Sequence, residues 1–124
     1  MDASLNVLGT PLQNCSFAPL TGWFRDGCCN TDDHDHGSHT VCAIVSDDFL
    51  MHLQSRGNDL ITPVPQHGFK GLKAGQQWCV CAASWYDAYL EGKACDVQLE
   101  STHAKALRIV PLEALMAHAA GAVE

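Results

Sequence analysis

Val41-Cys42-Ala43-Ile44-Val45 is apolar at every position, so both faces of a strand with this sequence need to be covered. Trp78-Cys79-Val80-Cys81-Ala82 has a similar pattern, and we expect a second strand there that is also buried on both faces. Helix-start signals follow both stretches, at Ser46-Asp47-Asp48 and at Ser84 with Asp87 three residues later. The two stretches therefore predict the central strands of a sheet that helices cover.

The rest of the chain predicts an α+β fold: a single compact domain, residues 1–124, with a small central sheet, flanking helices and long irregular loops. Further helices are expected after Thr102 and Pro111, and a short strand over residues 97–100. The first third has no helical period and predicts extended pieces and turns. Residues 58–77 also lack a period, and a connection of this length in a compact domain is typical of a working loop.

The charge of the chain argues against two classes of partner. Fourteen acidic side chains stand against seven Lys and Arg, for a formal charge of −7. The basic residues are scattered, so no basic stripe is available for nucleic acid or for an anionic membrane surface. The sequence has neither a secretory signal pattern nor a long apolar run, which predicts a cytoplasmic protein in which lasting disulfides are uncommon.

The chain has seven cysteines and seven histidines, and most of them fall into three short groups, at residues 28–29, 34–42 and 79–81. Thiols and imidazoles bind soft or borderline metals, and they also act as nucleophiles and bases. Two of the cysteines, at 28 and 29, are neighbours in a turn, so only one is expected to face a common cluster. We therefore predict a metal site for zinc or iron, built from a subset of Cys28, Cys29, His39, Cys42, Cys79 and Cys81.

Two other classes of function remain open from the residues alone. The first is an enzyme with a cysteine nucleophile or a thiol redox pair, for which the candidates are Cys29 as nucleophile, His39 or His103 as base, and Asp26 or Asp59 as the group that orients the base. The second is a structural or partner-binding domain whose cysteines fill the core. The sequence does not identify a small-molecule or protein partner, and it does not give the oligomeric state.

A series of ordered motifs runs along nearly the whole chain: Asn6-Val7-Leu8-Gly9, Thr21-Gly22-Trp23-Phe24-Arg25-Asp26-Gly27-Cys28-Cys29, Asp35-x-Gly37-x-His39-Thr40-Val41-Cys42, Arg56-Gly57-Asn58-Asp59-Leu60, Gly71-Leu72-Lys73-x-Gly75, Trp78-Cys79-x-Cys81-Ala82 and Thr102-His103. Together they closely resemble the bacterial family catalogued as domain of unknown function 2237. The resemblance implies a small soluble single-domain protein and no particular activity. His34, His36 and Cys95 lie outside the motifs that carry it, which favours an incidental role for these three residues.

Overall fold

The computed structural model describes residues 4–120 of the chain. Its centre is a three-stranded antiparallel sheet in the order β2-β1-β3, with bounds β1 His39–Ile44, β2 Gln77–Cys81 and β3 Asp96–Val97. The two apolar stretches supply most of β1 and β2. The prediction that both are central strands holds for β1 and is wrong for β2, which lies at the edge of the sheet because no further strand pairs with it within residues 4–120. The prediction of an α+β fold with a small central sheet is confirmed.

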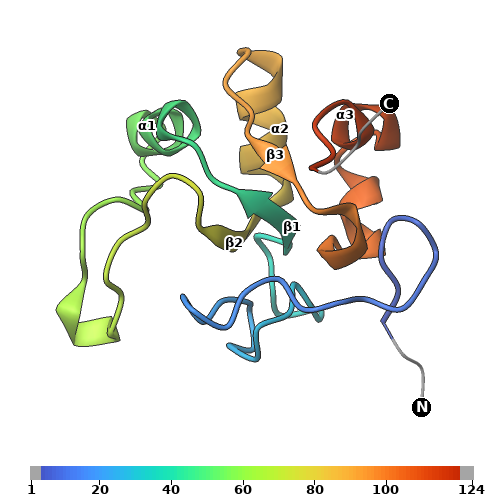
Figure 1. Ribbon diagram of the computed structural model, residues 1–124, viewed down its shortest axis with the longest axis horizontal. Coiled ribbons are helices and arrows are strands. Elements are labelled where there is room, and N and C mark those ends of the chain that lie inside the picture. The colour runs from blue at the N-terminus through green and yellow to red at the C-terminus, as the bar shows by residue number, and fades with distance from the viewer. Residues whose placement is uncertain (1–3, 121–124) are drawn as a thin grey trace.

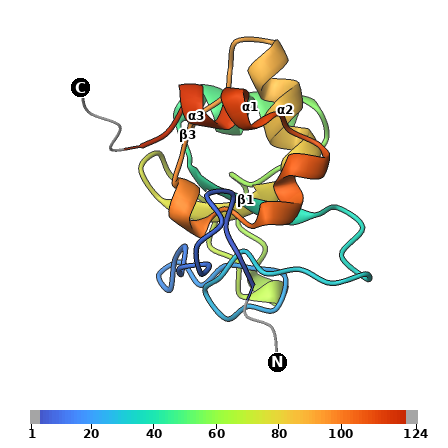
Figure 2. The same cartoon turned by 90° about the vertical axis from the view of Figure 1, so that its right-hand side faces the viewer.

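The helices and the first third of the chain cover opposite faces of the sheet (Figures 1 and 2). The three α-helices lie above the sheet in Figure 1, and the irregular segment before β1 lies below it. The helical elements are α1 Asp47–Ser55, α2 Ala82–Leu90 and α3 Leu112–Ala117, with short 3-10 turns η1 Pro65–His67, η2 Leu99–Ser101 and η3 Ala104–Arg108.

The alternation of side chains along each strand divides the interior into two cores. Successive residues of a strand point to opposite faces of its sheet. Val41, Ala43 and Val80 accordingly join the apolar core, which also contains residues of the helices. Cys42 and Cys79, from the alternate positions, form a second cluster with Cys15 and Cys29. Both faces of the two strands are therefore buried, one against the apolar core and the other against the cysteine cluster.

The start of α1 agrees with its sequence signal, and the start of α2 does not. Ser46 is the N-cap of α1, and its hydroxyl accepts the Phe49 N–H at 3.2 Å. The prediction that Ser84 caps the second helix is wrong, because α2 begins at Ala82 with Cys81 as its N-cap. Strand β2 passes into α2 without a linker, so the last residue of the strand occupies the amino end of the helix.

The cap of the short helical turn after β3 also lies one residue from its predicted position. Thr102 was the expected cap, but its hydroxyl donates to the Gln98 carbonyl and accepts the Cys42 N–H. The cap of η3 is His103, whose Nδ1 accepts the Lys105 N–H at 3.0 Å. Thr102 therefore links this turn to the central strand and is not available as a cap.

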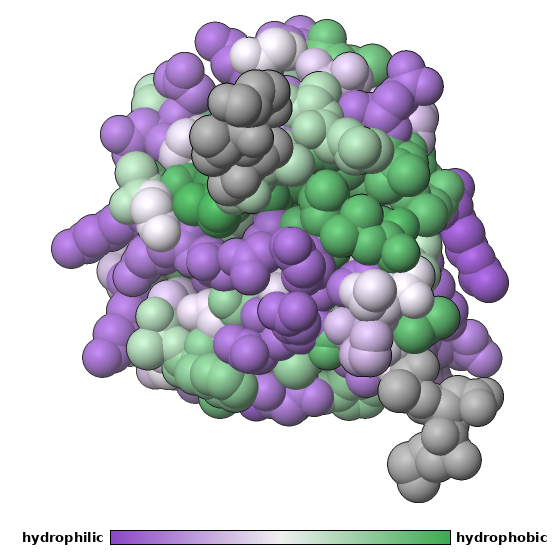
Figure 3. Space-filling model, turned by 45° about the vertical axis from the view of Figure 1, so that its right-hand side comes forward, coloured by the Kyte–Doolittle hydropathy of each residue, from purple (hydrophilic) through white to green (hydrophobic). Residues whose placement is uncertain are grey.

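The surface is mixed in character. In Figure 3 a polar band separates regions of apolar surface on the side of the molecule that is turned toward the viewer. Within residues 4–120, no helix combines the length and the apolar content that crossing a membrane would require. The large apolar side chains that are exposed come from several separate parts of the chain, among them Leu8, Phe17, Phe24, Met51, Leu90 and Met116.

Candidate thiol active site

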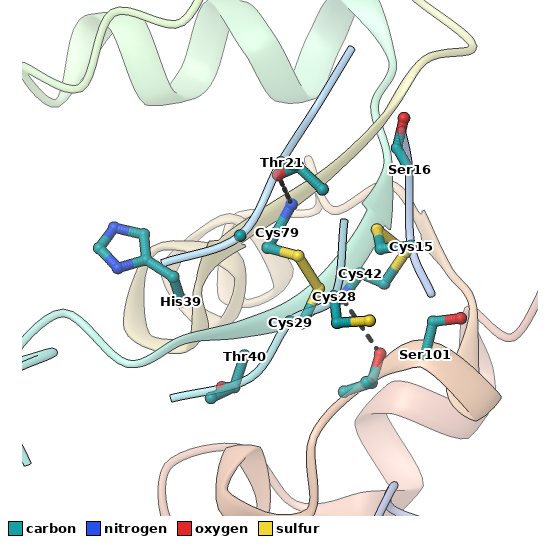
Figure 4. The surroundings of a disulfide bond; sticks show 12 residues. Cys15, Ser16, Thr21, Cys28, Cys29, His39, Thr40, Cys42, Cys79 and Ser101 are labelled. Carbon is teal, nitrogen blue, oxygen red and sulfur yellow. Dashed lines mark hydrogen bonds between the residues drawn. A yellow bond between two sulfur atoms is a disulfide. The ribbon is translucent and has the colours of Figure 1, made fainter. Parts of the chain in front are cut away.

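Two disulfides join the irregular first third of the chain to the paired strands β1 and β2 (Figure 4). Cys15 is bonded to Cys42 of β1, and Cys29 is bonded to Cys79 of β2. Cys42 and Cys79 face each other in the strand register, so both sulfurs point toward the segment that carries the other two. Lasting disulfides are expected to be uncommon in a cytoplasmic protein, but the sequence leaves open whether any forms. In the structure these four cysteines are paired.

Three thiols remain free within residues 4–120, and they differ in environment. Burial, and then the neighbouring Asp96 carboxylate, raise the pKa of Cys95 to about 12. Partial burial, and then the Asp26 carboxylate, raise the pKa of Cys28 above its usual value. Both groups are therefore protonated at neutral pH, which makes them poor nucleophiles. The third free thiol, Cys81, has a different set of neighbours.

Cys81, His39 and Asp35 form a continuous line of side chains. The His39 ring lies between the other two, with Nε2 3.4 Å from the Cys81 sulfur and Nδ1 2.6 Å from Asp35 Oδ1. The Asp35 side chain is fully buried, and its second oxygen accepts the Thr31 hydroxyl and the His39 N–H, each at 2.9 Å. This is the geometry of a nucleophile, a base and a group that orients the base.

The sequence places these three residues together by simple means. His39 is the first residue of β1 and Cys81 is the last residue of β2, and the antiparallel register sets them opposite each other. Asp35 precedes His39 by four residues in a tight loop whose turns are closed by backbone hydrogen bonds. Two strand ends and one loop therefore fix the site.

The contacts along this line favour a positive charge on His39 and a negative charge on Asp35. The hydrogen bond with Cys81 raises the pKa of His39 to about 9, with burial acting against it and Asp35 adding to it. Burial alone would raise the pKa of Asp35, but its hydrogen bonds with His39 and Thr31 outweigh burial and lower that pKa. At neutral pH the His39 ring is thus an imidazolium that can donate from both nitrogens.

A cavity of about 500 Å³ opens beside this line, and both Cys81 and His39 are part of its wall. This volume lies in the range of small-molecule sites. The Trp23 ring stacks on the His39 ring, with centroids 6.1 Å apart and planes 9° from parallel. The expected working loop supplies one side of the wall, through Asn58, Asp59, Leu60, Val64, His67 and Phe69.

Gly37 leaves the space in which the His39 ring and the Cys81 sulfur meet. A Cβ at this position would lie 2.9 Å from His39 Cε1 and 3.0 Å from Cys81 Sγ. We expect Gly37→Ala to push the two groups apart and to slow alkylation of Cys81 by roughly tenfold, because small misplacements in a reacting pair are costly. The rate at Cys81 is measured by mass spectrometry after timed alkylation.

The matched control is Gly57→Ala, because an added Cβ there meets no atom within 4 Å. Gly57 has a positive φ, so this variant also tests whether backbone strain alone affects the site. An unchanged rate in Gly37→Ala, or an equal loss in both variants, would contradict the tight contact between the ring and the sulfur.

The structure brings together only some of the residues that the sequence suggested as catalytic. His39 lies at the site, whereas Cys29 is held in a disulfide. Asp26 is exposed and accepts the Cys28 N–H at 3.0 Å. Asp59 is on the cavity wall, but its carboxylate accepts the backbone N–H groups of residues 61 and 62. No hydrogen bond joins His103 to a thiol within residues 4–120.

Asp35 is the residue that sequence reasoning missed. It is not among the catalytic candidates that the sequence suggested, and its neighbours His34 and His36 are exposed. The available signal was its place in the motif Asp35-x-Gly37-x-His39. The sequence does not show that Asp35 is buried while Asp33 is exposed, because this difference depends on the fold.

The structure brings together only some of the predicted metal ligands. The sulfurs of Cys29 and Cys79 lie within 4.8 Å of each other and of the sulfur of Cys15, which was not predicted as a ligand, and Cys42 is bonded to Cys15. Cys28, His39 and Cys81 do not belong to this group of three. The sulfur group is compatible with a metal site in the reduced chain, whereas in the disulfide form Cys29 is bonded to Cys79 and Cys15 to Cys42.

Fold and site together define a small α+β protein with a cysteine, histidine and aspartate line beside a cavity. The chain belongs to the family described as "Uncharacterized protein conserved in bacteria (DUF2237)", which it matches over residues 5–119. This confirms the family resemblance of the sequence motifs. No curated protein gives a significant match to the chain.

Proposed function

We propose that this protein is a thiol-dependent enzyme that acts on acyl compounds, with Cys81 as the nucleophile. The observation that carries the proposal is the line from the Cys81 sulfur through the His39 ring to the buried Asp35 carboxylate. A structural histidine would not need a buried carboxylate on one nitrogen and a free thiol on the other. The cavity beside the sulfur supplies room for a substrate.

The chemistry follows from the position of each group. The Cys81 sulfur attacks the acyl carbon, a sulfur–carbon bond forms, and the bond from that carbon to the leaving group breaks. His39 gives its Nε2 proton to the leaving group. Water then attacks the thioester while His39 takes a proton from it, and the acid leaves as the thiolate is restored.

The amino end of α2 supports the role of Cys81. No side chain caps this helix, and Cys81 is its N-cap residue. A helix amino end carries partial positive charge and unpaired N–H groups, which favour negative charge at a nearby sulfur or oxygen. Strand β2 holds the sulfur from the other side, so the nucleophile rests on two regular elements and not on a loop.

The proposal is tested with p-nitrophenyl acetate. The expected result is a burst of p-nitrophenol and an acetyl adduct on Cys81 by mass spectrometry. Cys81→Ser is expected to remove both, whereas Cys28→Ser, which changes the other partly exposed free thiol, is expected to keep them. An acetyl adduct on other residues only, or a burst that survives in Cys81→Ser, would contradict the proposal.

A second candidate function is supported by the group of three sulfurs around Cys29. In a reduced chain, Cys15, Cys29, Cys42 and Cys79 would offer four thiolates for a tetrahedral zinc or iron ion. A dithiol reductant would supply the four electrons and four protons that open the two disulfides. Metal binding would then displace the thiol protons.

Elemental analysis of protein made without a histidine tag tests the metal function. Under a dithiol reductant we expect about one zinc or iron ion per chain. Cys15→Ala is expected to abolish binding, and Cys95→Ala, which changes a free thiol outside the group, to retain it. Reduced protein that stays metal-free in the presence of added zinc would contradict this function and leave the Cys81 proposal untouched.

A further inference from the structure

The loop at Thr21-Gly22-Trp23-Phe24-Arg25-Asp26-Gly27 contributes a part of the cavity wall separate in sequence from the loop that begins at Asn58. Trp23 and Arg25 both line the cavity. The loop is anchored to β2, because the Thr21 hydroxyl accepts the Cys79 N–H at 2.9 Å and Cys29 is bonded to Cys79. Its position relative to Cys81, two residues further along β2, is therefore fixed.

Arg25 is held in an unusual backbone conformation. Its φ of 55° lies in the left-handed region, which costs free energy for residues other than glycine. Its guanidinium group lies 5.2 Å from the centroid of the Trp78 ring, and Nη1 donates to the Gly22 carbonyl at 2.8 Å. The fold thus fixes both the backbone and the side chain of this residue at the cavity.

The guanidinium group has no acidic partner. No carboxylate lies within 4.0 Å of Arg25 in the part of the chain from residue 4 to residue 120, although the chain has twice as many acidic as basic side chains. One nitrogen is used by Gly22, and the other N–H groups remain available. A fixed arginine at a cavity fits a planar anion such as a carboxylate.

The remaining wall decides between kinds of anion. Trp23, Phe69 and Trp78 give the cavity an aromatic, apolar lining. The Asp59 carboxylate is also part of the wall, and hydrogen bonds from residues 61 and 62 lower its pKa to about 2, so it stays charged. A phosphate dianion would be repelled there more strongly than a singly charged carboxylate.

We propose that the cavity takes acyl compounds that carry a carboxylate on an apolar body, with Arg25 binding the carboxylate. This inference rests on the proposed role of Cys81 and names the substrate class of the same site. Arg25 determines specificity and takes no part in bond breaking. The aromatic side chains would hold the apolar body between Arg25 and the Cys81 sulfur.

Two alkylating agents that differ in charge provide the test. Iodoacetate and iodoacetamide both form a sulfur–carbon bond at Cys81 and release iodide, but only iodoacetate carries a carboxylate. The measured quantity is the ratio of the two rate constants at Cys81, read by mass spectrometry at one neutral pH. Arg25→Gln is expected to lower the ratio roughly tenfold.

Two further variants separate charge from folding. Arg25→Gly suits the left-handed φ and is expected to lower the ratio as Arg25→Gln does. Lys73→Gln removes an exposed positive charge outside the cavity and is expected to leave the ratio unchanged. A ratio that is the same in the unmodified protein and in both Arg25 variants overturns the inference.

Competition identifies the kind of anion. Benzoate is expected to slow iodoacetamide labelling of Cys81 in the unmodified protein and to have no effect in Arg25→Gln. Protection by inorganic phosphate without protection by benzoate overturns the carboxylate assignment. The proposed function fails in a different way, namely if iodoacetamide reacts no faster with Cys81 than with Cys28, whatever the effect of Arg25.

Discussion

Cys29→Ala/Cys79→Ala is expected to lower the free energy of unfolding by about 4 kcal/mol, because this disulfide closes a loop with a sequence separation of 50 residues. In the chain-entropy account, most of this effect comes from the freedom that the unfolded chain regains. A loss of this size is a large part of the stability of an ordinary domain. Urea unfolding of the oxidised protein and of the variant measures it.

The position of the bond adds a second consequence. Cys29 holds the loop with Trp23 and Arg25 against β2, so the variant is also expected to slow alkylation of Cys81. Cys28→Ala, which alters the adjacent free thiol, is the matched control and should change stability by much less. A double variant as stable as the oxidised protein would mean that the Cys29 bond does not constrain the native chain.

His39→Ala is expected to lower the rate of acyl transfer to Cys81 by about 10²-fold or more, which is the usual contribution of a positioned acid or base. The reason is that Nε2 lies 3.4 Å from the sulfur and, in the proposed reaction, donates the proton to the leaving group. The rate of the p-nitrophenol burst measures the effect. An unchanged burst would exclude His39 from the reaction.

Asp35→Asn tests the third member of the line. The amide keeps the size of the side chain but loses the charge that the His39 ring faces at 2.6 Å. We expect Asp35→Asn to slow the p-nitrophenol burst as well. The effects of Asp35→Asn and His39→Ala are expected to be far from additive in the double variant, since residues that act as a unit show such coupling. Asp26→Asn, at an exposed carboxylate outside the line, is expected to react like the unmodified protein.

Much of the fold could be predicted because apolar pattern and register are local properties. Two stretches that are apolar on both faces became the paired strands β1 and β2, and Ser46 began a helix as its spacing indicated. The α2 boundary was missed because a strand ran directly into a helix, and Ser84 offered a false start within the first turn. Capping residues in the sequence do not reveal a strand that continues directly into a helix.

The site could be predicted only in part because pairing between sulfurs is a long-range property. Cys42 lies opposite Cys79 in the strand register, but no spacing in the sequence shows that each pairs with a cysteine of the first third. Those disulfides leave Cys81 as the free thiol beside His39. The sequence did not identify Asp35 as a site residue for a similar reason, since its burial depends on how the loop folds back on His39.

The relative alkylation rates of Cys81 and Cys28 in one native sample test the central claim most directly. Both thiols are free and partly exposed, but only Cys81 is beside His39, while burial and Asp26 raise the pKa of Cys28. With iodoacetamide at neutral pH, we expect Cys81 to react at least about tenfold faster than Cys28, and to lose that advantage in His39→Ala. Equal rates for the two thiols, or an advantage that persists without His39, would contradict a catalytic line of Cys81, His39 and Asp35.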